Sequence, residues 1–403
     1  MGVQHEGGRG WAMGDAAGYV DTGRIVARAE RESGAFGLCG DELRGRVDLL
    51  ASRINAAGPL DAADLRAVED QMLRVLVNRL LIQLDRTRFP AIAGEPITRP
   101  VFIIGFARSG TTLLHSLLAE DPQALSPRSW HMYSPSPPPG AGPVVSGRMA
   151  YAQRQVEAWS DFCPAQKPLH PYIDKGALQL IEDEELFALD LRSAYPYHFY
   201  RFRGLEPGMT MLGSDPAGAF AFHRQMLQHL QWNTGKTRWV CKGPSHQMNL
   251  RALLDTYPDA LCIWAHRPIG EIYASNVAIR AATYDAIRGE AVDWASQAKA
   301  HVMGMKAAVD ALIASDLIDD PRVMHMAFRD IARDPLAAVG RVYDRLGEPF
   351  TDAAQAAMRG WLDDPENASD RYGKYPYTYE AFGLDRAWVE SLFAEYSARF
   401  GLN

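Results

Sequence analysis

The chain has few cysteines, and none of them are paired in a motif. Its 403 residues include only Cys39, Cys163, Cys241 and Cys262, with no C-x-x-C pair among them. Scattered cysteines of this kind favour free thiols in a reducing compartment over a disulfide framework or a zinc site. We therefore expect a cytoplasmic protein with four free thiols. The sequence also has no D-x-D or H-x-H pair, so we expect no metal.

The chain also lacks an excess of positive charge and any long apolar run. Its formal net charge is −7, which implies no general attraction to nucleic acid or to an anionic membrane. No apolar run approaches the roughly 20 residues that span a bilayer, and residues 1–17 have no apolar centre of the kind found in signal peptides. We expect neither a nucleic-acid partner nor membrane association.

What the sequence does have is a stretch with the pattern of a phosphate-binding loop. Residues 101–104 form a continuous apolar run typical of a strand buried on both faces. A loop bounded by Gly105 and Gly110 follows, and leucines at helical spacing follow the loop. A strand, a short loop and a helix in this order direct backbone N–H groups and the positive end of the helix dipole at one anion.

This loop differs from a nucleoside triphosphate loop at one position. The spacing G-x-x-x-x-G-T-T is close to the Walker A pattern, but Thr111 stands where that pattern has lysine. Arg108 is the one cation in the loop. We expect Arg108, Ser109, Gly110, Thr111 and Thr112 to hold a phosphate. Triphosphate chemistry with Mg²⁺ is disfavoured, because the lysine that holds the β- and γ-phosphates is missing.

Two further apolar runs end in a basic residue. Lys242 follows the run 237–241, and Arg267 follows the run 260–266, with Ser275 two helical turns later. Active groups in open α/β sheets lie at such carboxyl ends of strands. His246, four residues after Lys242, is a weaker candidate for contact with a cofactor or substrate.

The three blocks, in this order, resemble the donor-binding elements of sulfotransferases that use 3′-phosphoadenosine 5′-phosphosulfate (PAPS). The likeness is greatest to the bacterial branch related to tyrosylprotein sulfotransferases, and it runs from about residue 100 to the C-terminus. It implies that residues 108–112 hold the 5′-phosphosulfate and that Lys242 lies at the transferred group. It also implies that Arg267 and Ser275 grip the 3′-phosphate. Ala107 departs from the proline that many relatives have there.

The resemblance implies further roles in the tail and after the loop. Arg371 and Lys374 match tail cations near the 3′-phosphate. A catalytic base follows the loop's helix in relatives, and the aligned residue here is His131, whose ordinary pKa of about 6.5 suits proton transfer near neutral pH. A loop histidine bonded only to backbone is the alternative. A second candidate base lies among the four acids at 182–185, although a solvated first turn of a helix is the simpler interpretation.

The expected fold is α/β, with a P-loop-type central parallel sheet flanked by helices. Helical spacing between residues 43 and 80 predicts that residues 1–95 form an N-terminal helical extension. The resemblance implies that residues 96–403 form a PAPS-dependent sulfotransferase domain. We expect sulfuryl transfer to a hydroxyl of a small hydrophobic or phenolic acceptor, with the aromatic stretch 195–202 a candidate lining. The alternatives are a P-loop small-molecule kinase and a non-catalytic nucleotide-binding protein.

Overall fold

The protein is built on a central sheet of five parallel strands. The computed structural model describes residues 18–143, 146–172, 175–192, 215–288, 293–373 and 376–402, so Lys374 and the stretch 195–202 lie outside the described residues. The strand order is β2-β3-β1-β4-β5, and every neighbouring pair is parallel. The predicted parallel sheet is confirmed. The strands are β1 Val101–Ile104, β2 Ala124–Leu125, β3 Arg238–Lys242, β4 Leu261–His266 and β5 Val323–Ala327.

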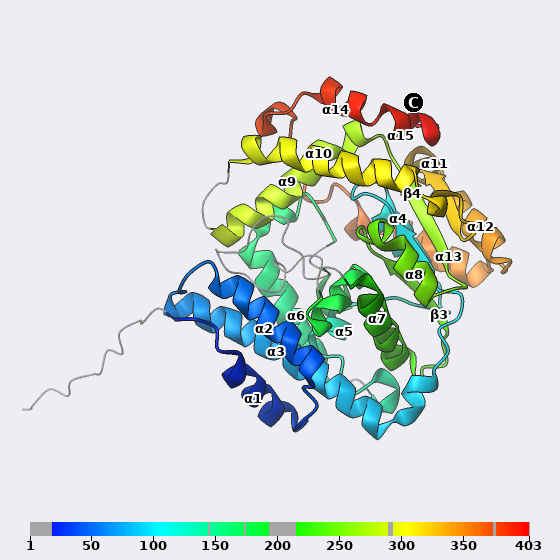
Figure 1. Ribbon diagram of the computed structural model, residues 1–403. Helices are drawn as coiled ribbons and strands as arrows, with labels where there is room; N and C mark the ends of the chain where they lie inside the picture. The colour runs from blue at the N-terminus through cyan, green and yellow to red at the C-terminus, as the bar shows by residue number, and fades with distance from the viewer. Residues whose placement is uncertain are drawn as a thin grey trace, which may run out of the picture.

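Helices cover both faces of this sheet (Figure 1). On β1, Phe102 and Ile104 belong to one hydrophobic core, whereas Val101 and Ile103 belong to another. Successive side chains of a strand point to opposite faces, so alternate residues pack against different helices. The first core includes α7 (Pro216–Gln231), α8 (Leu250–Thr256), α9 (Ile269–Arg288) and α10 (Trp294–Ile313). The second includes α4 (Thr111–Ala119), α11 (Phe328–Arg333), α12 (Pro335–Leu346) and α13 (Asp352–Asp363).

The N-terminal helices share the first of these cores. They are α1 (Thr22–Ser33), α2 (Asp41–Asn55) and α3 (Ala62–Arg88), and they lie at the opposite end of the molecule from α14 (Arg386–Leu392) and α15 (Ala394–Arg399) (Figure 1). Asp61 caps α3 by accepting the backbone N–H groups of Ala63 and Asp64. The remaining α-helices are α5 (Ser129–Tyr133) and α6 (Ser146–Phe162).

Short 3₁₀ helices connect these elements. They are η1 (Pro90–Gly94), η2 (Pro139–Ala141), η3 (Pro164–Gln166), η4 (Gly176–Leu178), η5 (Asp183–Asp190), η7 (His246–Asn249), η8 (Asp316–Asp319), η9 (Pro365–Asn367) and η10 (Glu380–Phe382). The four cysteines are buried free thiols, as predicted. Among the helices of the described ranges, none is both long and apolar enough to cross a membrane.

The acids at 182–185 are not the solvated helical turn that their composition favours. They do begin a helix, but that helix is η5, and Asp183 and Glu184 are only 0% and 1% exposed. Burying a carboxylate is costly unless it is paired or hydrogen-bonded. The simpler interpretation of this run is therefore wrong, because specific partners replace water around these side chains.

Gly105, directly after β1, lies against the backbone of β4. Its φ is +134°, and a Cβ added there would lie 2.5 Å from the carbonyl oxygen of Ala265. Both the backbone conformation and the close approach require glycine.

We expect Gly105→Ala to lower the free energy of unfolding more than the control Gly235→Ala does. Gly235 also has a positive φ (+76°), but nothing lies within 4 Å of its added Cβ. A left-handed conformation costs an alanine about 1–2 kcal/mol, and only at position 105 does a clash with backbone add to this cost. Urea unfolding of both variants measures the difference. Equal decreases in the free energy of unfolding would show that the close approach to Ala265 adds no cost at position 105.

Candidate active site

The carboxyl ends of three neighbouring strands bring the predicted groups to one edge of the sheet. β1 pairs with β3 on one side and with β4 on the other, with Ile103 in register with Lys242 and Ile104 with Trp264. Because parallel strands end at the same edge, the loop after β1 lies between Lys242 at the end of β3 and Arg267 just after β4. The predicted positions of Lys242 and Arg267 at the carboxyl ends of two strands are thus confirmed.

The loop from Gly105 to Gly110 is held from neighbouring elements by hydrogen bonds. The backbone N–H of Gly105 donates to Gln247 Oε1 at 3.0 Å. Arg267 Nη1 donates to the carbonyl oxygen of Arg108 at 3.2 Å, and Asn276 Nδ2 donates to that of Ala107 at 3.2 Å. These contacts fix the loop's backbone, so its N–H groups do not need a ligand to order them.

The residues predicted to hold a phosphate lie together at the start of α4. The Ser109 hydroxyl donates to the carbonyl oxygen of Phe106 at 2.7 Å, and Gly110, with φ +91°, precedes the first residue of α4. Thr111 is buried and Thr112 is half-buried at the N-terminus of that helix. A Cβ at Gly110 would lie 2.7 Å from the Phe328 ring. Glycine at this position therefore lets Phe328 pack against the N-terminus of α4, a place where anions bind favourably.

Arg108 and Arg267 lie close to one another at the loop before α4. Arg108 Nη1 donates to the carbonyl oxygen of Leu169 at 2.8 Å. Burial lowers the pKa of Arg108, and repulsion from Arg267 lowers it further against the opposing effect of Tyr377. Two guanidinium groups that destabilise each other in this way are suited to sharing an anion. The Arg267 guanidinium also stacks over Phe328, 4.3 Å from the ring centroid.

The other two described residues assigned to the 3′-phosphate differ in their surroundings. Ser275 on α9 is 2% exposed, and its hydroxyl has no hydrogen-bond partner among the described residues. A buried hydroxyl without a partner is unfavourable unless another group supplies the missing hydrogen bond. Arg371 instead donates through Nε to the carbonyl oxygen of Pro171 at 3.0 Å, and it also contacts Glu366.

Lys242 forms an ion pair with Glu182, the residue just before η5. Lys242 Nζ lies 2.7 Å from Glu182 Oε1, and the two side chains are 6% and 25% exposed. His170 belongs to the same surroundings. Its pKa is lowered to about 4, mainly by burial and also by Lys242 and Arg108, against the opposing effect of Glu182. Sequence reasoning missed His170, because no strand end or loop pattern marks it.

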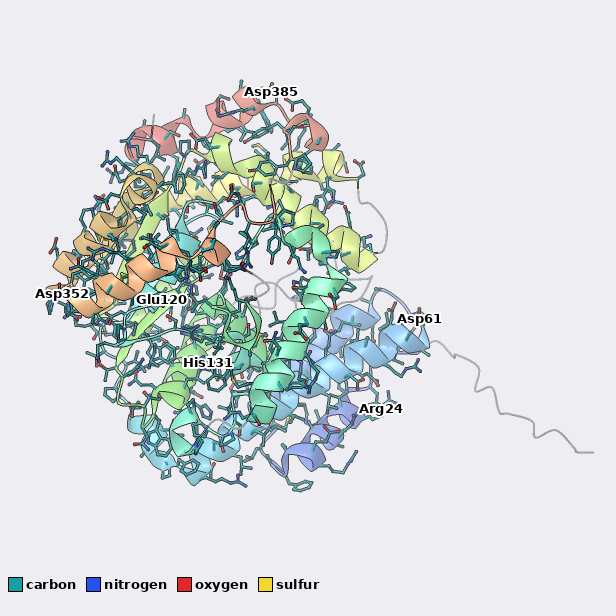
Figure 2. The ribbon with its side chains drawn as sticks, turned by 180° about the vertical axis from the view of Figure 1, so that it is seen from behind. Arg24, Asp61, Glu120, His131, Asp352 and Asp385 are labelled. Carbon is teal, nitrogen blue, oxygen red and sulfur yellow. The ribbon has the colours of Figure 1, made fainter. Side chains whose placement is uncertain are left out.

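His131 lies apart from this group. It is 6% exposed, within the short helix α5, where its Nδ1 accepts the backbone N–H of Arg128 at 3.1 Å (Figure 2). Burial lowers its pKa to about 3, helped by Arg128, Arg148 and His229. None of these three residues belongs to the group around Lys242. Among the described residues no contact joins His131 to Lys242, and its bond to Arg128 matches the alternative of a histidine bonded to backbone.

The acids that follow Glu182 contact the segment just after Lys242. Asp183 Oδ2 lies 2.8 Å from His246 Nε2, and Glu184 Oε2 accepts the backbone N–H of Ser245 at 3.0 Å. Burial acts to raise the pKa of Asp183, but His246 and His223 together outweigh it and hold the pKa well below its usual range. For Glu185, burial and the charge of Glu182 raise the pKa to about 8.

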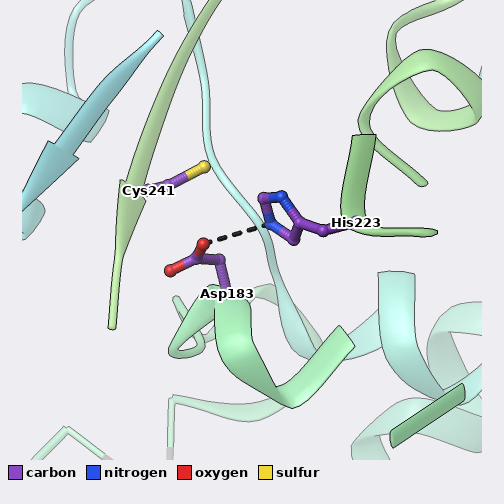
Figure 3. Close-up of side chains that lie close together, drawn as sticks. All are labelled: Asp183, His223 and Cys241. Carbon is purple, nitrogen blue, oxygen red and sulfur yellow. Dashed lines mark ion pairs between the residues drawn. The ribbon is translucent and has the colours of Figure 1, made fainter. Parts of the chain in front are cut away.

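One group of side chains has the donor types of a metal site. Oxygen, nitrogen and sulfur atoms of Asp183, His223 and Cys241 lie within 4.8 Å of one another, and all three residues are buried (Figure 3). Such donors suit zinc, and they come from distant parts of the chain, so no spacing motif reveals them. Asp183 Oδ2 already lies 3.1 Å from His223 Nε2 as well as 2.8 Å from His246. Asp183 Oδ1, by contrast, is buried and has no hydrogen-bond partner among the described residues.

Comparison with known proteins identifies the family of this chain. The model of the sulfotransferase family matches residues 100–352. Omega-hydroxy-beta-dihydromenaquinone-9 sulfotransferase Stf3 of Mycobacterium bovis is 23% identical over 317 residues, which are 75% of this chain and 75% of that protein. The protein of the same name from Mycobacterium tuberculosis matches equally well.

Two crystal structures of mycobacterial sulfotransferases share the fold. STF1 of Mycobacterium tuberculosis H37Rv has a TM-score of 0.72 at 24% identity and covers 94% of this chain and 100% of its own. STF9 of Mycobacterium avium has a TM-score of 0.72 at 23% identity, with 94% and 97% covered. The family match spans the loop, Lys242, Arg267 and the strands that carry them. The chain therefore belongs to the sulfotransferase family and is a sulfotransferase.

Proposed function

We propose that this enzyme transfers the sulfuryl group of PAPS to a hydroxyl of a small hydrophobic acceptor. The observation that carries the proposal is the pair of Lys242 and Glu182, 2.7 Å apart at the sheet edge that also presents the phosphate loop. A cation and a carboxylate at one point offer charge stabilisation for a leaving oxygen and a proton acceptor for an attacking hydroxyl.

The residues present fit PAPS as the donor. The N-terminus of α4 and the loop amides suit the 5′-phosphosulfate, with Arg108, Thr111 and Thr112 around them. The unpartnered Ser275 hydroxyl and Arg267 suit the 3′-phosphate, the group that distinguishes PAPS from ATP. Arg371 lies on the same side through its contact with Pro171, next to His170. We propose these residues as the donor site; Lys374, outside the described residues, stays a prediction.

Sulfuryl transfer is catalysed mainly by positioning the reactants and by stabilising the charge that develops during the reaction. The acceptor oxygen forms a bond to sulfur while the bond from sulfur to the bridging oxygen of the phosphosulfate breaks. Lys242 stabilises the negative charge that grows on that bridging oxygen, and Arg108 stabilises the equatorial charge. The acceptor's proton moves to a carboxylate. Side chains and amides meet each developing charge, so the proposed reaction needs no metal.

We place the proton acceptor at Glu182 rather than at His131. The Glu182 side chain is 25% exposed and touches Lys242, whereas His131 is 6% exposed and its Nδ1 is occupied by the Arg128 N–H. The acids at 182–185, the second candidate from the sequence, thus become the favoured source of the base.

The acceptor is inferred from the relatives and the composition of the chain. The two Stf3 relatives act, by their names, on omega-hydroxy-beta-dihydromenaquinone-9. Apolar and aromatic residues are frequent in the chain between 130 and 205. We propose an acceptor of that general kind, with an apolar body and a free hydroxyl.

The donor assignment predicts a ligand preference. PAP, the product nucleotide, should raise the melting temperature more than AMP or ATP at equal concentration, because only PAP carries the 3′-phosphate. At about 100 times its Kd a ligand adds about 2.7 kcal/mol to stability, which a thermal-shift assay resolves. In Arg267→Ala the preference for PAP over AMP should disappear. Stronger stabilisation by ATP than by PAP would refute the assignment.

The role of Lys242 predicts a loss of turnover without loss of donor binding. Lys242→Ala should lower kcat by about 10²–10³-fold, the usual cost of removing one group that stabilises transition-state charge. PAP binding by calorimetry should persist, because the loop and Arg267 are unchanged. The assay is transfer of labelled sulfate from PAPS, run as a screen over phenols, sterols and hydroxylated quinones. Near-normal turnover in Lys242→Ala would remove the lysine from the mechanism.

The two candidate bases can be separated with matched substitutions. Glu182→Gln should lower kcat by about 10²–10⁴-fold, the range expected for a lost general base. His131→Gln replaces a neutral buried side chain and should stay within about tenfold of wild type, below that range. Both variants are compared at saturating PAPS. The opposite order of losses would return the role to His131.

A further inference from the structure

The 3₁₀ helix η5 (Asp183–Asp190) is held by charged groups at both of its ends. At its last residue, Asp190 is buried and is surrounded by arginines. Arg46 Nη2 lies 2.9 Å and Arg79 Nε 2.7 Å from Asp190 Oδ1, and Arg192 donates to Oδ2. Arg46 Nε also donates to the carbonyl oxygen of Asp190 at 2.9 Å. Arg46 belongs to α2 and Arg79 to α3, so the N-terminal helices hold this end.

At the other end, three consecutive acids hold the segment that follows β3. Glu182 binds Lys242, Asp183 binds His246, and Glu184 binds the backbone N–H and the hydroxyl of Ser245. Each acid therefore takes a different residue between 242 and 246. His223 on α7 gives Asp183 a second contact at 3.1 Å, and His223 is itself bonded to the Tyr257 hydroxyl at 2.8 Å.

The same segment continues to the phosphate loop. Gln247, next to His246, accepts the Gly105 N–H, and the Gly243 N–H donates to the carbonyl oxygen of Ile103 at 3.3 Å. A Cβ at Gly243 would lie 2.6 Å from the His246 ring. The ring thus packs directly on the backbone beside Lys242. Contacts run without interruption from the arginines of α2 and α3, through η5, to the segment 242–247 and the loop.

This chain of contacts restricts how η5 can move. A shift of the helix toward either end would leave a buried charge without its partner, at Asp190 or at Asp183, and such charges are strongly unfavourable when unpaired. The position of Glu182 and Lys242 therefore depends on where α2 and α3 hold Asp190. Both helices lie outside residues 100–352, the part of the chain that matches the family model.

We propose that the described part of the N-terminal helical extension, residues 18–95, is a positioning element of the transfer site. Through Arg46 and Arg79 it fixes η5, and η5 fixes Glu182 and the segment that carries Lys242. This inference rests on the proposed function for its effect on turnover. Its structural part, the chain of contacts from α3 to residues 242–247, does not depend on the proposed function. Arg46, Arg79 and Asp190 act through other residues and touch no reacting atom.

The test compares Arg79→Gln with a control in the same extension. Arg28→Gln removes ion pairs with Glu32 and Asp70, at 2.7 and 3.4 Å, that do not reach η5. Arg79→Lys keeps the charge near Asp190 and serves as the rescue variant. For each variant, hydrogen–deuterium exchange is followed in peptides covering 182–192, 242–249 and 105–110. Peptides from α12 report any general loss of stability.

We expect Arg79→Gln to raise exchange in all three of those regions relative to α12, with Arg28→Gln unchanged and Arg79→Lys largely restored. Turnover with an acceptor found in the transfer screen should fall by about tenfold to 10²-fold, the scale of a misplacement of about 1 Å, while KM for PAPS and the Kd of PAP change little. Asp190→Asn, measured in the same way, should show the same changes in exchange and turnover.

Two results would overturn the inference. The first is faster exchange in Arg79→Gln that is confined to 182–192 and leaves 242–249 unaffected, or that is equally large in α12. In either case the extension would contribute only stability. The second is unchanged kcat in Arg79→Gln despite faster exchange at 242–249. Failure of the proposed function looks different. Wild-type protein would then neither bind PAP nor transfer sulfate, and the exchange pattern would still report on the link.

Discussion

Parallel pairing of β1 with both β3 and β4 is the constraint on which the site depends. Because all three strands run in the same direction, their carboxyl ends meet at one edge, and the loop after β1 lies between Lys242 and Arg267. Glycine at position 105 lets the loop turn against the backbone of β4. The sheet thus places an anion cradle, a lysine and an arginine together before any ligand contact is considered.

The sheet supplies cations, and the matching carboxylates come from a separate helix. Lys242 is almost fully buried and would be costly there without a partner. Glu182 provides that partner, and the acids after it bind His246 and Ser245. Each buried charge of this group meets an opposite charge or a hydrogen-bond donor. The same matching recurs at Asp190, which links the group to the N-terminal helices.

His131 shows that the surroundings of a residue cannot be predicted from its position along the chain. It follows the helix after the loop at the place where relatives have their base, and its ordinary pKa is suitable. In the folded chain it lies within α5, bonded to the Arg128 backbone, and burial makes it a weak base. Glu182 lies much later in the chain, yet it reaches Lys242 because η5 packs against the end of β3. Distance along the sequence says nothing about that packing.

The sequence by itself determined the elements whose signals are local. The apolar run 101–104, the glycines at 105 and 110 and the hydroxyls after them predict strand, loop and helix, and the basic residues after two other strands predict the sheet edge. Only the tertiary structure decided that Asp183 and Glu184 are buried, that Lys242 acts on the pKa of His170, and that Asp183, His223 and Cys241 meet. The reason is physical: strand and turn patterns depend on neighbours along the chain, whereas burial of a charge depends on which distant partner folds against it.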